Sequence, residues 1–408
     1  MSVCKVAAVL FLAALVAGPA HAQFITANSK GFTDSCGNDY TFAGFDVWRL
    51  LEAAAGINGP GNPSSSELNG LDTLDYLFTK ASAANLTWLR FFGVADDDGG
   101  LPGGPLQTAP GQYNEQLFVG FDKIIAALPK YNIKASIVLI DFWKQTDGVQ
   151  QYLAWCAGNT SDVSVFYSSS ACNQLYFNHV TTVLNRVNTI TGVAYKNDPN
   201  IFGWEIINEP RCIAGATSGT EQAPASCVQA LQTFIDKAAA HIKSIDKNHL
   251  VTVGEEGFFD TSGQYESANP RAVQGSGQSF ENNHKSANID YASMHLWPDN
   301  WNNPILPMSF DDAWISDHEA ASTALGKPLV LSEFGIQCLN GNSSCQTSTR
   351  NPYFSDIYQV ETYDIQVPSS TFTGPITAAG QFVATKNQLC PAPNAPSLAP
   401  GAAVQAAG

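Results

Sequence analysis

Residues 201–209 read IFGWEIINE and residues 328–333 read PLVLSE, two short apolar runs that each end in a carboxylate. Runs of this length, bounded by Pro or Gly, are typical of buried parallel strands. Glu209 and Glu333 therefore stand at the carboxyl ends of two strands, which is where barrel enzymes carry their catalytic residues. The pattern predicts an α/β protein with two carboxylates at one end of its parallel sheet.

The same strand pattern recurs along the chain, separated by segments of helical periodicity. Apolar residues at helical spacing predict helices within residues 71–78, 117–128, 180–190 and 228–242. Such βα repeats form either an open doubly wound sheet or a closed barrel. Polar residues at several strand ends, and the lack of a glycine-rich dinucleotide motif, favour a single-domain (β/α)8 TIM barrel. The further predicted strands are Thr41–Asp46, Trp88–Phe92, Lys134–Asp141, His249–Gly254 and Ile289–Leu296.

The eighth strand is the least regular part of this pattern. Its best candidate is Ile376–Val383, a degenerate strand that contains Gly380. We expect it to close the barrel. Residues 391–408, beyond Cys390, are rich in Pro and Ala and are predicted to form a disordered tail.

The amino terminus predicts export. Residues 1–22 combine Lys5, an apolar stretch and the small-x-small pattern Ala20-His21-Ala22, which is typical of a cleaved secretory signal. The apolar stretch is too short to span a bilayer. Residues 23–390 then form the catalytic domain. We expect a secreted protein, extracellular or in a cell wall. Three N-glycosylation sequons, at Asn85, Asn159 and Asn342, fit this route.

Cysteine usage agrees with an oxidising compartment. Nine cysteines are present, and removal of Cys4 with the signal leaves an even number. Sequence proximity favours the pairs Cys156–Cys172, Cys212–Cys227 and Cys338–Cys345, which leaves Cys36–Cys390. The alternative is that these are free buried thiols.

The charge restricts the class of partner. A formal net charge of −16 argues against nucleic acid and anionic membranes, whereas a neutral polymer is not repelled. We expect a polysaccharide as substrate and a monomeric protein.

The two glutamates supply what glycoside hydrolysis needs, an acid for the leaving oxygen and a carboxylate that attacks the sugar or activates water. Either one could instead pair with an arginine or cap a helix. Metal binding is a weaker alternative, because the seven histidines show no ligand-type spacing around these strands. No nucleophile elbow or phosphate loop is present. We therefore expect no metal and no organic cofactor.

Aromatic residues follow several of the predicted strands. Indole rings stack on the apolar faces of sugars, so these residues are candidates for a polysaccharide cleft. Any one of them could simply be packing, but their recurrence favours the cleft. They include Trp48, Trp143, Trp297 and Trp301.

Several segments together resemble the endo-β-1,4-mannanases of glycoside hydrolase family 5, of the plant and fungal type. The resemblance covers roughly residues 38–337. The segments are FAGFDVW at 42–48, WLR at 88–90, YKNDPNIFGWEIINEPRC at 195–212, GEEGF at 254–258, HLWPDNW at 295–301 and SEFG at 332–335.

The resemblance implies a role for each matching residue. Glu209 would be the acid/base, its pKa raised by apolar surroundings and by the second carboxylate. Glu333 would be the nucleophile, kept ionised by Arg90, with the carboxyls about 5–5.5 Å apart as in retaining enzymes. Asn208 would hold the sugar 2-hydroxyl. His295 would complete the polar network, while Arg211 and Glu256 would line the leaving-group subsites.

Two positions depart from the family pattern. Trp297 stands where the family most often has a tyrosine hydrogen-bonded to the nucleophile, and we expect its indole N–H to donate to Glu333 instead. Phe382-Val383 stands where the family has Phe-Trp, whose tryptophan floors the reacting sugar. We expect Phe382, or else Trp297 or Trp143, to supply that floor.

The resemblance implies a retaining endo-β-1,4-mannanase acting on mannan, glucomannan or galactomannan. Two alternatives stay open. One is another β-glucanase of the same fold. The other is a wall-polysaccharide-binding barrel with little turnover, which the missing eighth-strand tryptophan motivates.

Overall fold

A computed structural model describes the central part of the chain. The described residues are 24–57, 72–94, 104–144, 146, 148–158, 160–213, 222–271, 275–301 and 305–335. The predicted signal peptide, the eighth-strand candidate with Phe382, the Cys338–Cys345 pair and the carboxyl-terminal tail lie outside these residues and stay predictions.

Among the described residues, seven parallel strands form the centre of the fold, and all seven were predicted. Five of them pair in the order β10-β9-β8-β5-β4, and the other two form the pair β11-β12. Five are shorter than predicted, because β8, β9 and β10 leave the regular ladder before the polar strand ends and β4 and β11 join it later than expected. The strands are β4 (Gly44–Asp46), β5 (Trp88–Phe92), β8 (Lys134–Val138), β9 (Ile201–Glu205), β10 (Leu250–Thr252), β11 (Ala292–Leu296) and β12 (Leu329–Phe334).

Backbone hydrogen bonds join the two groups of strands. The Asp290 N–H donates to the Val251 carbonyl at 2.8 Å, and the His295 N–H donates to the Glu256 carbonyl at 3.1 Å. Strand β11 therefore lies beside β10, and the strands follow one another in chain order. The predicted eighth strand would lie between β12 and β4.

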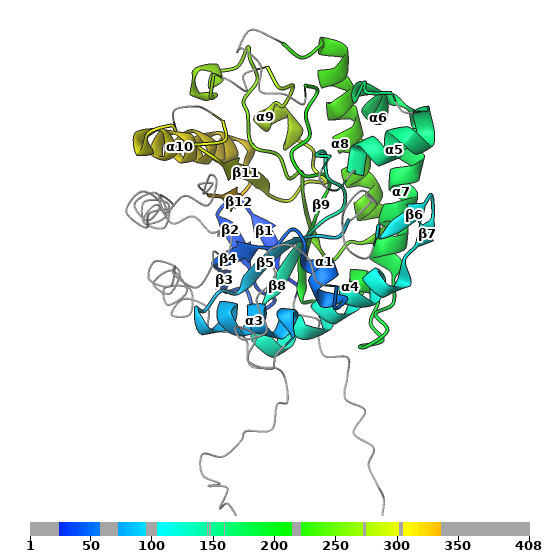
Figure 1. The fold of residues 1–408 in the computed structure, drawn as a ribbon. Coiled ribbons are helices and arrows are strands. Elements are labelled where there is room, and N and C mark those ends of the chain that lie inside the picture. Colours follow the sequence, from blue (N-terminus) through cyan, green and yellow to red (C-terminus); the bar gives the residue numbers. More distant parts are fainter. Residues whose placement is uncertain are drawn as a thin grey trace, which may run out of the picture.

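Helices surround the strands, as Figure 1 shows. Helix α3 begins at an Asp72 cap that accepts from the Asp75 N–H at 2.8 Å, and α4 begins at an Asn114 cap. The described helices are α1 (Leu50–Ala54), α3 (Thr73–Ala83), α4 (Glu115–Ala127), α5 (Gly148–Ala157), α6 (Ser164–Ser168), α7 (Ser170–Asn185), α8 (Ala225–Ile245), α9 (Phe280–Asn283) and α10 (Met308–Leu325).

Four of these helices, α3, α4, α7 and α8, match the four predicted segments, but the prediction for residues 180–190 runs too far. Helix α7 ends at Asn185. The Asn188 side chain then accepts from the N–H groups of Ile190 and Thr191, at 2.8 and 3.1 Å, and turns the chain. Val187 and Ile190 are each 56% exposed, so the apolar periodicity continued past the helix that it predicted.

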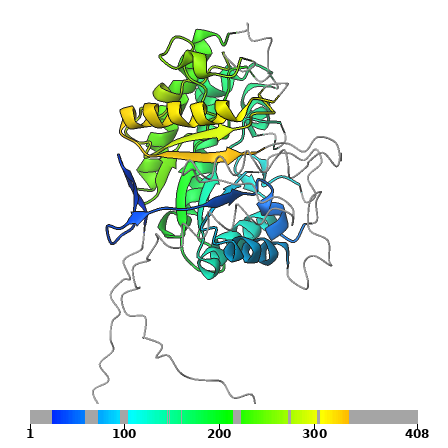
Figure 2. The same cartoon turned by 90° about the vertical axis from the view of Figure 1, so that its left-hand side faces the viewer.

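A small antiparallel sheet, which was not predicted, covers the amino-terminal end of the barrel. It consists of β1 (Thr26–Asn28), β2 (Gly31–Thr33) and β3 (Asp39–Tyr40). Figure 2 shows it at the end from which β12 starts. Its apolar side chains pack on residues at the starts of the parallel strands. This cluster, the amino-end cluster, comprises Ile25, Phe32, Tyr40, Phe42, Trp88, Phe202, Leu250, Tyr291 and Val330.

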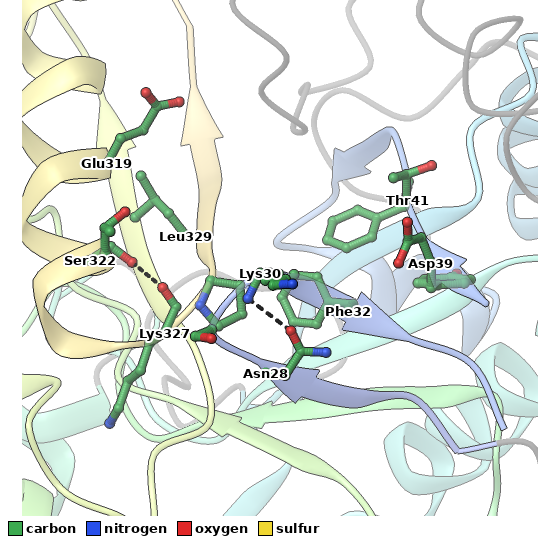
Figure 3. Close-up of a pocket in the computed structure, with 15 residues that line it drawn as sticks. Asn28, Lys30, Phe32, Asp39, Thr41, Glu319, Ser322, Lys327 and Leu329 are labelled. Carbon is green, nitrogen blue, oxygen red and sulfur yellow. Dashed lines mark hydrogen bonds between the residues drawn. The ribbon is translucent and has the colours of Figure 1, made fainter. Parts of the chain in front are cut away.

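A groove of about 530 Å³ lies between this small sheet and helix α10. Figure 3 shows Asn28, Phe32 and Asp39 on one wall, and Glu319 and Leu329 on the other. The groove opens at the amino ends of the strands. The predicted site residues lie at the opposite end.

Two disulfides confirm predicted pairs. Cys156–Cys172 joins α5 to α7 with 5.2 Å between Cα atoms, and Cys212–Cys227 joins the chain after β9 to α8 with 5.9 Å. Cys36 is also disulfide-bonded. Its predicted partner Cys390 lies outside the described residues, so this pairing stays a prediction. No helix among the described residues combines the length and apolar character needed to cross a bilayer.

The amino-end cluster predicts a stability effect. Phe202 is buried and its ring lies against those of Phe32 and Phe42. Phe202→Ala should lower the free energy of unfolding by about 3–5 kcal/mol, measured by urea denaturation, because it leaves a cavity. The control Val187→Ala, at an exposed site, should change it by less than about 0.5 kcal/mol. Equal effects would show that the cluster contributes little.

Candidate active site

The site lies at the carboxyl ends of the parallel strands. Strand register sets Asp46 of β4 beside Arg90 of β5, and His295 of β11 beside Glu333 of β12. Asn208 follows β9 and forms an isolated bridge with Asp141. Because the strands are parallel, their ends converge and bring together residues that are far apart in the chain.

Arg90 is the centre of the site and is fully buried. Its Nη1 donates to Asp46 Oδ2 at 2.6 Å and also to Glu333 Oε1. Its Nε donates to Glu205 Oε2 at 3.0 Å, and Nη2 donates to the other Glu205 oxygen. Nη2 also donates to Asn208 Oδ1 at 2.8 Å. One guanidinium thus contacts three carboxylates and an amide, and the predicted proximity of Arg90 and Glu333 is confirmed.

The network carries more negative than positive charge. Burial opposes the charged form of Arg90, but the carboxylates of Glu205, Glu333 and Asp46 hold its pKa above the usual value. Burial raises the pKa of Asp46 to about 7, with the Arg90 charge opposing and the Glu333 charge adding to it. The Asp46 carboxyl is therefore protonated more readily than an ordinary aspartate.

Glu333 is held through both carboxylate oxygens. Besides the contact from Arg90, its Oε2 accepts a hydrogen bond of 3.1 Å from the Trp297 indole N–H, which confirms the expected replacement of a tyrosine hydroxyl. A Cβ at Gly335 would lie only 2.6 Å from the Trp297 ring. The glycine therefore leaves the space that the indole occupies.

Glu209 sits on a constrained turn and is also held through both oxygens. Its φ is +47°, unusual for a residue other than Gly, and its N–H donates to the Gly254 carbonyl at 2.7 Å. One carboxylate oxygen lies 2.6 Å from His295 Nδ1, and the other accepts from the Trp143 indole N–H. His295 Nδ1 also lies 3.6 Å from Glu333.

The protonation of Glu209 differs from the expectation of a raised pKa. Burial does favour the neutral acid, but the hydrogen bond and charge of His295, together with the Arg211 charge, lower the Glu209 pKa below its usual value. Burial opposes the charged form of His295, yet Glu333 and Glu209 raise its pKa to about 9. The two side chains thus share one proton, which the free protein keeps on the imidazole.

Glu209, His295 and Glu333 each offer a ligand-type atom, and these atoms all lie within 4.8 Å of one another. By donor type they could hold a metal ion. In this structure Nδ1 faces the Glu209 carboxylate at 2.6 Å and the Glu333 carboxylate at 3.6 Å. The arrangement is that of a hydrogen-bonded acid–base cluster.

Asn208 is fixed on both sides of its amide. Its oxygen accepts from Arg90, and its nitrogen donates to Asp141 Oδ1 at 2.9 Å. Asp141 also accepts from the Thr146 hydroxyl at 2.9 Å, and burial raises its pKa to about 7. The amide orientation needed to bind a hydroxyl is thereby set before any ligand arrives.

A buried layer adjoins Glu209. Arg211 Nε donates to Glu256 Oε2 at 2.7 Å, and its guanidinium lies 5.0 Å from the Trp143 ring centre. The Trp301 indole donates to Glu256 at 3.1 Å. Burial raises the Glu256 pKa to about 7, with the Arg211 charge opposing. Arg211, Glu256 and Trp301 are all buried, so this layer supports Trp143 rather than forming open surface. Their predicted contacts with substrate stay predictions.

Trp48 lies apart from this layer, in the short connection between β4 and α1. It is 41% exposed, and the Arg49 guanidinium lies 5.4 Å from its ring centre. An exposed indole at the carboxyl end of the barrel suits the predicted contact with a polymer.

Comparison with known proteins gives the family. The model for the family described as GH family 5 beta-mannosidase-like matches residues 22–375. The chain belongs to glycoside hydrolase family 5. It is 34% identical to mannan endo-1,4-beta-mannosidase 1 of Arabidopsis thaliana, over 81% of this chain and 75% of the relative. It is 33% identical to putative mannan endo-1,4-beta-mannosidase 9 of Oryza sativa subsp. japonica, over 92% and 84%.

Solved structures of the family agree with the fold. The endo-1,4-beta-mannanase from Rhizomucor miehei superposes with a TM-score of 0.71 at 24% identity, covering 89% of this chain and all of that one. The predicted (β/α)8 barrel is confirmed, and this family 5 member is a glycoside hydrolase.

The shared proton predicts a pH-dependent stability. The folded His295 pKa of about 9 exceeds its usual 6.5, so its contribution is complete below pH 6.5 and is lost as the pH rises through about 9. The difference in melting temperature between the wild type and His295→Gln should therefore shrink from about pH 6 to about pH 9.5.

His241→Gln is the matched control. Burial lowers the pKa of His241, so its contribution is lost as the pH falls, and the melting-temperature difference should change in the opposite direction. A difference for His295→Gln that does not depend on pH would contradict the shared proton.

Proposed function

We propose that this family 5 hydrolase is a secreted, retaining endo-β-1,4-mannanase that cleaves internal bonds of mannan, glucomannan or galactomannan. One observation carries the chemistry: an oxygen of Glu209 and an oxygen of Glu333 lie within 4.8 Å. Retaining glycosidases keep their carboxyls about 5–5.5 Å apart, whereas inverting enzymes need about 6.5–9.5 Å for a water molecule. The mannan substrate is supported by the names of the plant relatives.

In the first step, the Glu333 carboxylate attacks the anomeric carbon and the glycosidic bond breaks. Glu209 gives its proton to the departing oxygen, so that a neutral hydroxyl leaves. Hydrogen bonds from Arg90 and Trp297 hold the two oxygens of Glu333 and so fix the direction from which the carboxylate attacks. Asn208, fixed by Arg90 and Asp141, offers its amide to the sugar 2-hydroxyl.

In the second step, water gives a proton to Glu209 and its oxygen attacks the anomeric carbon. The bond to Glu333 breaks, and Glu333 leaves as a carboxylate. The configuration of the anomeric carbon is inverted twice and therefore retained.

His295 supplies the proton that Glu209 needs. In the free enzyme the pair keeps this proton on the imidazole. A bound sugar removes water from Glu209 and favours its neutral form, so the proton passes from Nδ1 to the carboxylate along the hydrogen bond whose heavy atoms lie 2.6 Å apart. Neutral Glu209 can then act as the acid.

Export is part of the proposal. The predicted signal peptide and the two disulfides support secretion to the extracellular space or cell wall. The substrate is then a wall polysaccharide, cleaved by a monomer.

The glutamate pair gives the direct test. The wild type should release reducing sugar from mannan, and Glu333→Ala should lower this activity by at least about 10⁴-fold while the protein still melts as a folded chain. Product analysis by NMR should show retention at the anomeric carbon. Glu209→Gln should be nearly as inactive on mannan, but on an aryl mannoside with a good leaving group its first step should partly survive.

Carboxymethyl cellulose and xyloglucan are the comparison substrates. Activity on these alone would replace the mannanase with another β-glucanase, and retention on a mannan affinity gel without release of product would favour a binding barrel. A Glu333→Ala variant with most of its activity left would disprove the nucleophile assignment.

Trp48 predicts a binding contribution outside the chemistry. Because its indole is 41% exposed and absent from the carboxylate network, Trp48→Ala should leave folding and kcat unchanged. Loss of one sugar-stacking indole should raise KM for polymeric mannan about tenfold or less, measured by reducing-sugar release. Trp143→Ala, which removes a bond to Glu209, should instead lower kcat. Equal KM values for wild type and Trp48→Ala would exclude the contact.

A further inference from the structure

Gln278 connects the two chain segments that carry Glu209 and Glu256. It lies between β10 and α9 and is buried. We propose that Gln278 is a positioning residue for the acid/base Glu209. This proposal rests on the proposed function of Glu209 and adds a residue that neither the strand pattern nor the family resemblance had indicated.

All polar capacity of the Gln278 amide is used. Its Nε2 donates to the Pro210 carbonyl at 3.1 Å and to Glu256 Oε2 at 3.1 Å. Its Oε1 accepts from the N–H groups of Gly257 and Phe258, each at 3.2 Å. Two donors and two accepting directions are what a glutamine side chain offers. One side chain thus joins the segment after β9 to the segment after β10.

The first route to Glu209 runs through the backbone. Glu209 has a φ of +47°, a conformation that persists only where its surroundings enforce it. Its own N–H is held by the Gly254 carbonyl at 2.7 Å. Gln278 holds the carbonyl of the next residue, Pro210. Both sides of the strained residue are therefore tied to the same segment.

The second route runs through side chains. Gln278 and Arg211 both donate to Glu256, which fixes the guanidinium of Arg211. This guanidinium lies over the ring of Trp143, and the Trp143 indole donates to the Glu209 carboxylate. Loss of Gln278 would loosen the Glu256 carboxylate and, through it, the donor that orients Glu209.

The backbone just before Gln278 packs closely against the chain after Arg211, which fixes the position of Gln278. The N–H groups of Cys212 and Ile213 donate to the Ser276 carbonyl, at 2.8 and 3.3 Å. Gly277 has a φ of +98°, and a Cβ there would lie 2.7 Å from Cys212 Cβ. The segment that carries Gln278 therefore packs against Cys212, one half of the Cys212–Cys227 disulfide.

Two isosteric substitutions separate positioning from packing. Gln278→Met fills the space but has no donor and only a weakly accepting sulfur. Gln278→Glu keeps the shape, but when ionised it cannot donate to the Pro210 carbonyl and it faces the Glu256 carboxylate. When protonated, the same side chain regains one O–H donor and an accepting oxygen. The other charged groups near this point are Arg211 and Glu209 after β9 and His295 on β11.

We expect Gln278→Met to lower kcat on mannan about tenfold to a hundredfold with KM within about twofold, as for a misplaced catalytic group. At about pH 8, Gln278→Glu should have a kcat as low as that of Gln278→Met. As the pH falls to about 5, its kcat relative to the wild type should recover. The ratio for Gln278→Met should stay constant. Gln229→Met, at an exposed position on α8, is the control and should match the wild type.

Melting temperatures of all variants show whether each one folds. A Gln278→Met variant with wild-type kcat, or the same pH dependence for both substitutions, would overturn the proposal. If Gln278→Met does not fold, the pH dependence of Gln278→Glu alone decides it, because a folding role does not predict recovery in acid. A wild-type protein that is inactive on every β-glycan would instead contradict the proposed function. If the wild type cleaves a β-glycan other than mannan, the kcat values of wild type and variants are compared on that substrate.

Discussion

The contacts of the buried Arg90 guanidinium are the constraint on which the rest of the site depends. They link residues from three strands, β4, β9 and β12, to β5, and the guanidinium at their centre is fully buried. Removing one partner of a buried ion pair is far more costly than the pair is stabilising, because the remaining charge is left unpaired. Removal of Arg90 would leave three carboxylates facing one another. The same residue therefore serves both barrel assembly and nucleophile geometry.

The strand ends could be predicted from the sequence because buried parallel strands are apolar along their length, so a carboxylate after them stands out. The partners of Arg90 could not all be predicted in this way. Glu205 lies within a strand, and only its inward direction, which depends on the alternation of side chains, makes it a ligand of the guanidinium. Asp46 and Asp141 each stood at the end of a predicted strand. That position was the sequence feature by which either could have been recognised as a site residue.

Other differences arise from interactions that no local pattern encodes. The Glu209 pKa depends on the imidazole of a residue 86 positions further along the chain, so apolar neighbours alone gave the wrong direction. The amino-end sheet consists of strands of two or three residues, too short for periodicity to reveal. Helix α7 stopped at a local turn made by Asn188 although the apolar pattern continued. Disulfide pairs close in sequence, by contrast, followed directly from spacing.

The indole of Trp297 has a consequence for the polarity of its contact with Glu333 and for the residue beside it. A phenol ionises near pH 10 and can accept as well as donate hydrogen bonds, whereas an indole N–H only donates. The Trp297 indole therefore remains a hydrogen-bond donor to Glu333 at alkaline as well as neutral pH. The larger ring also occupies the space beside Gly335, where a methyl group would collide with it. With tryptophan at residue 297, residue 335 can carry a side chain only if the indole or the backbone shifts.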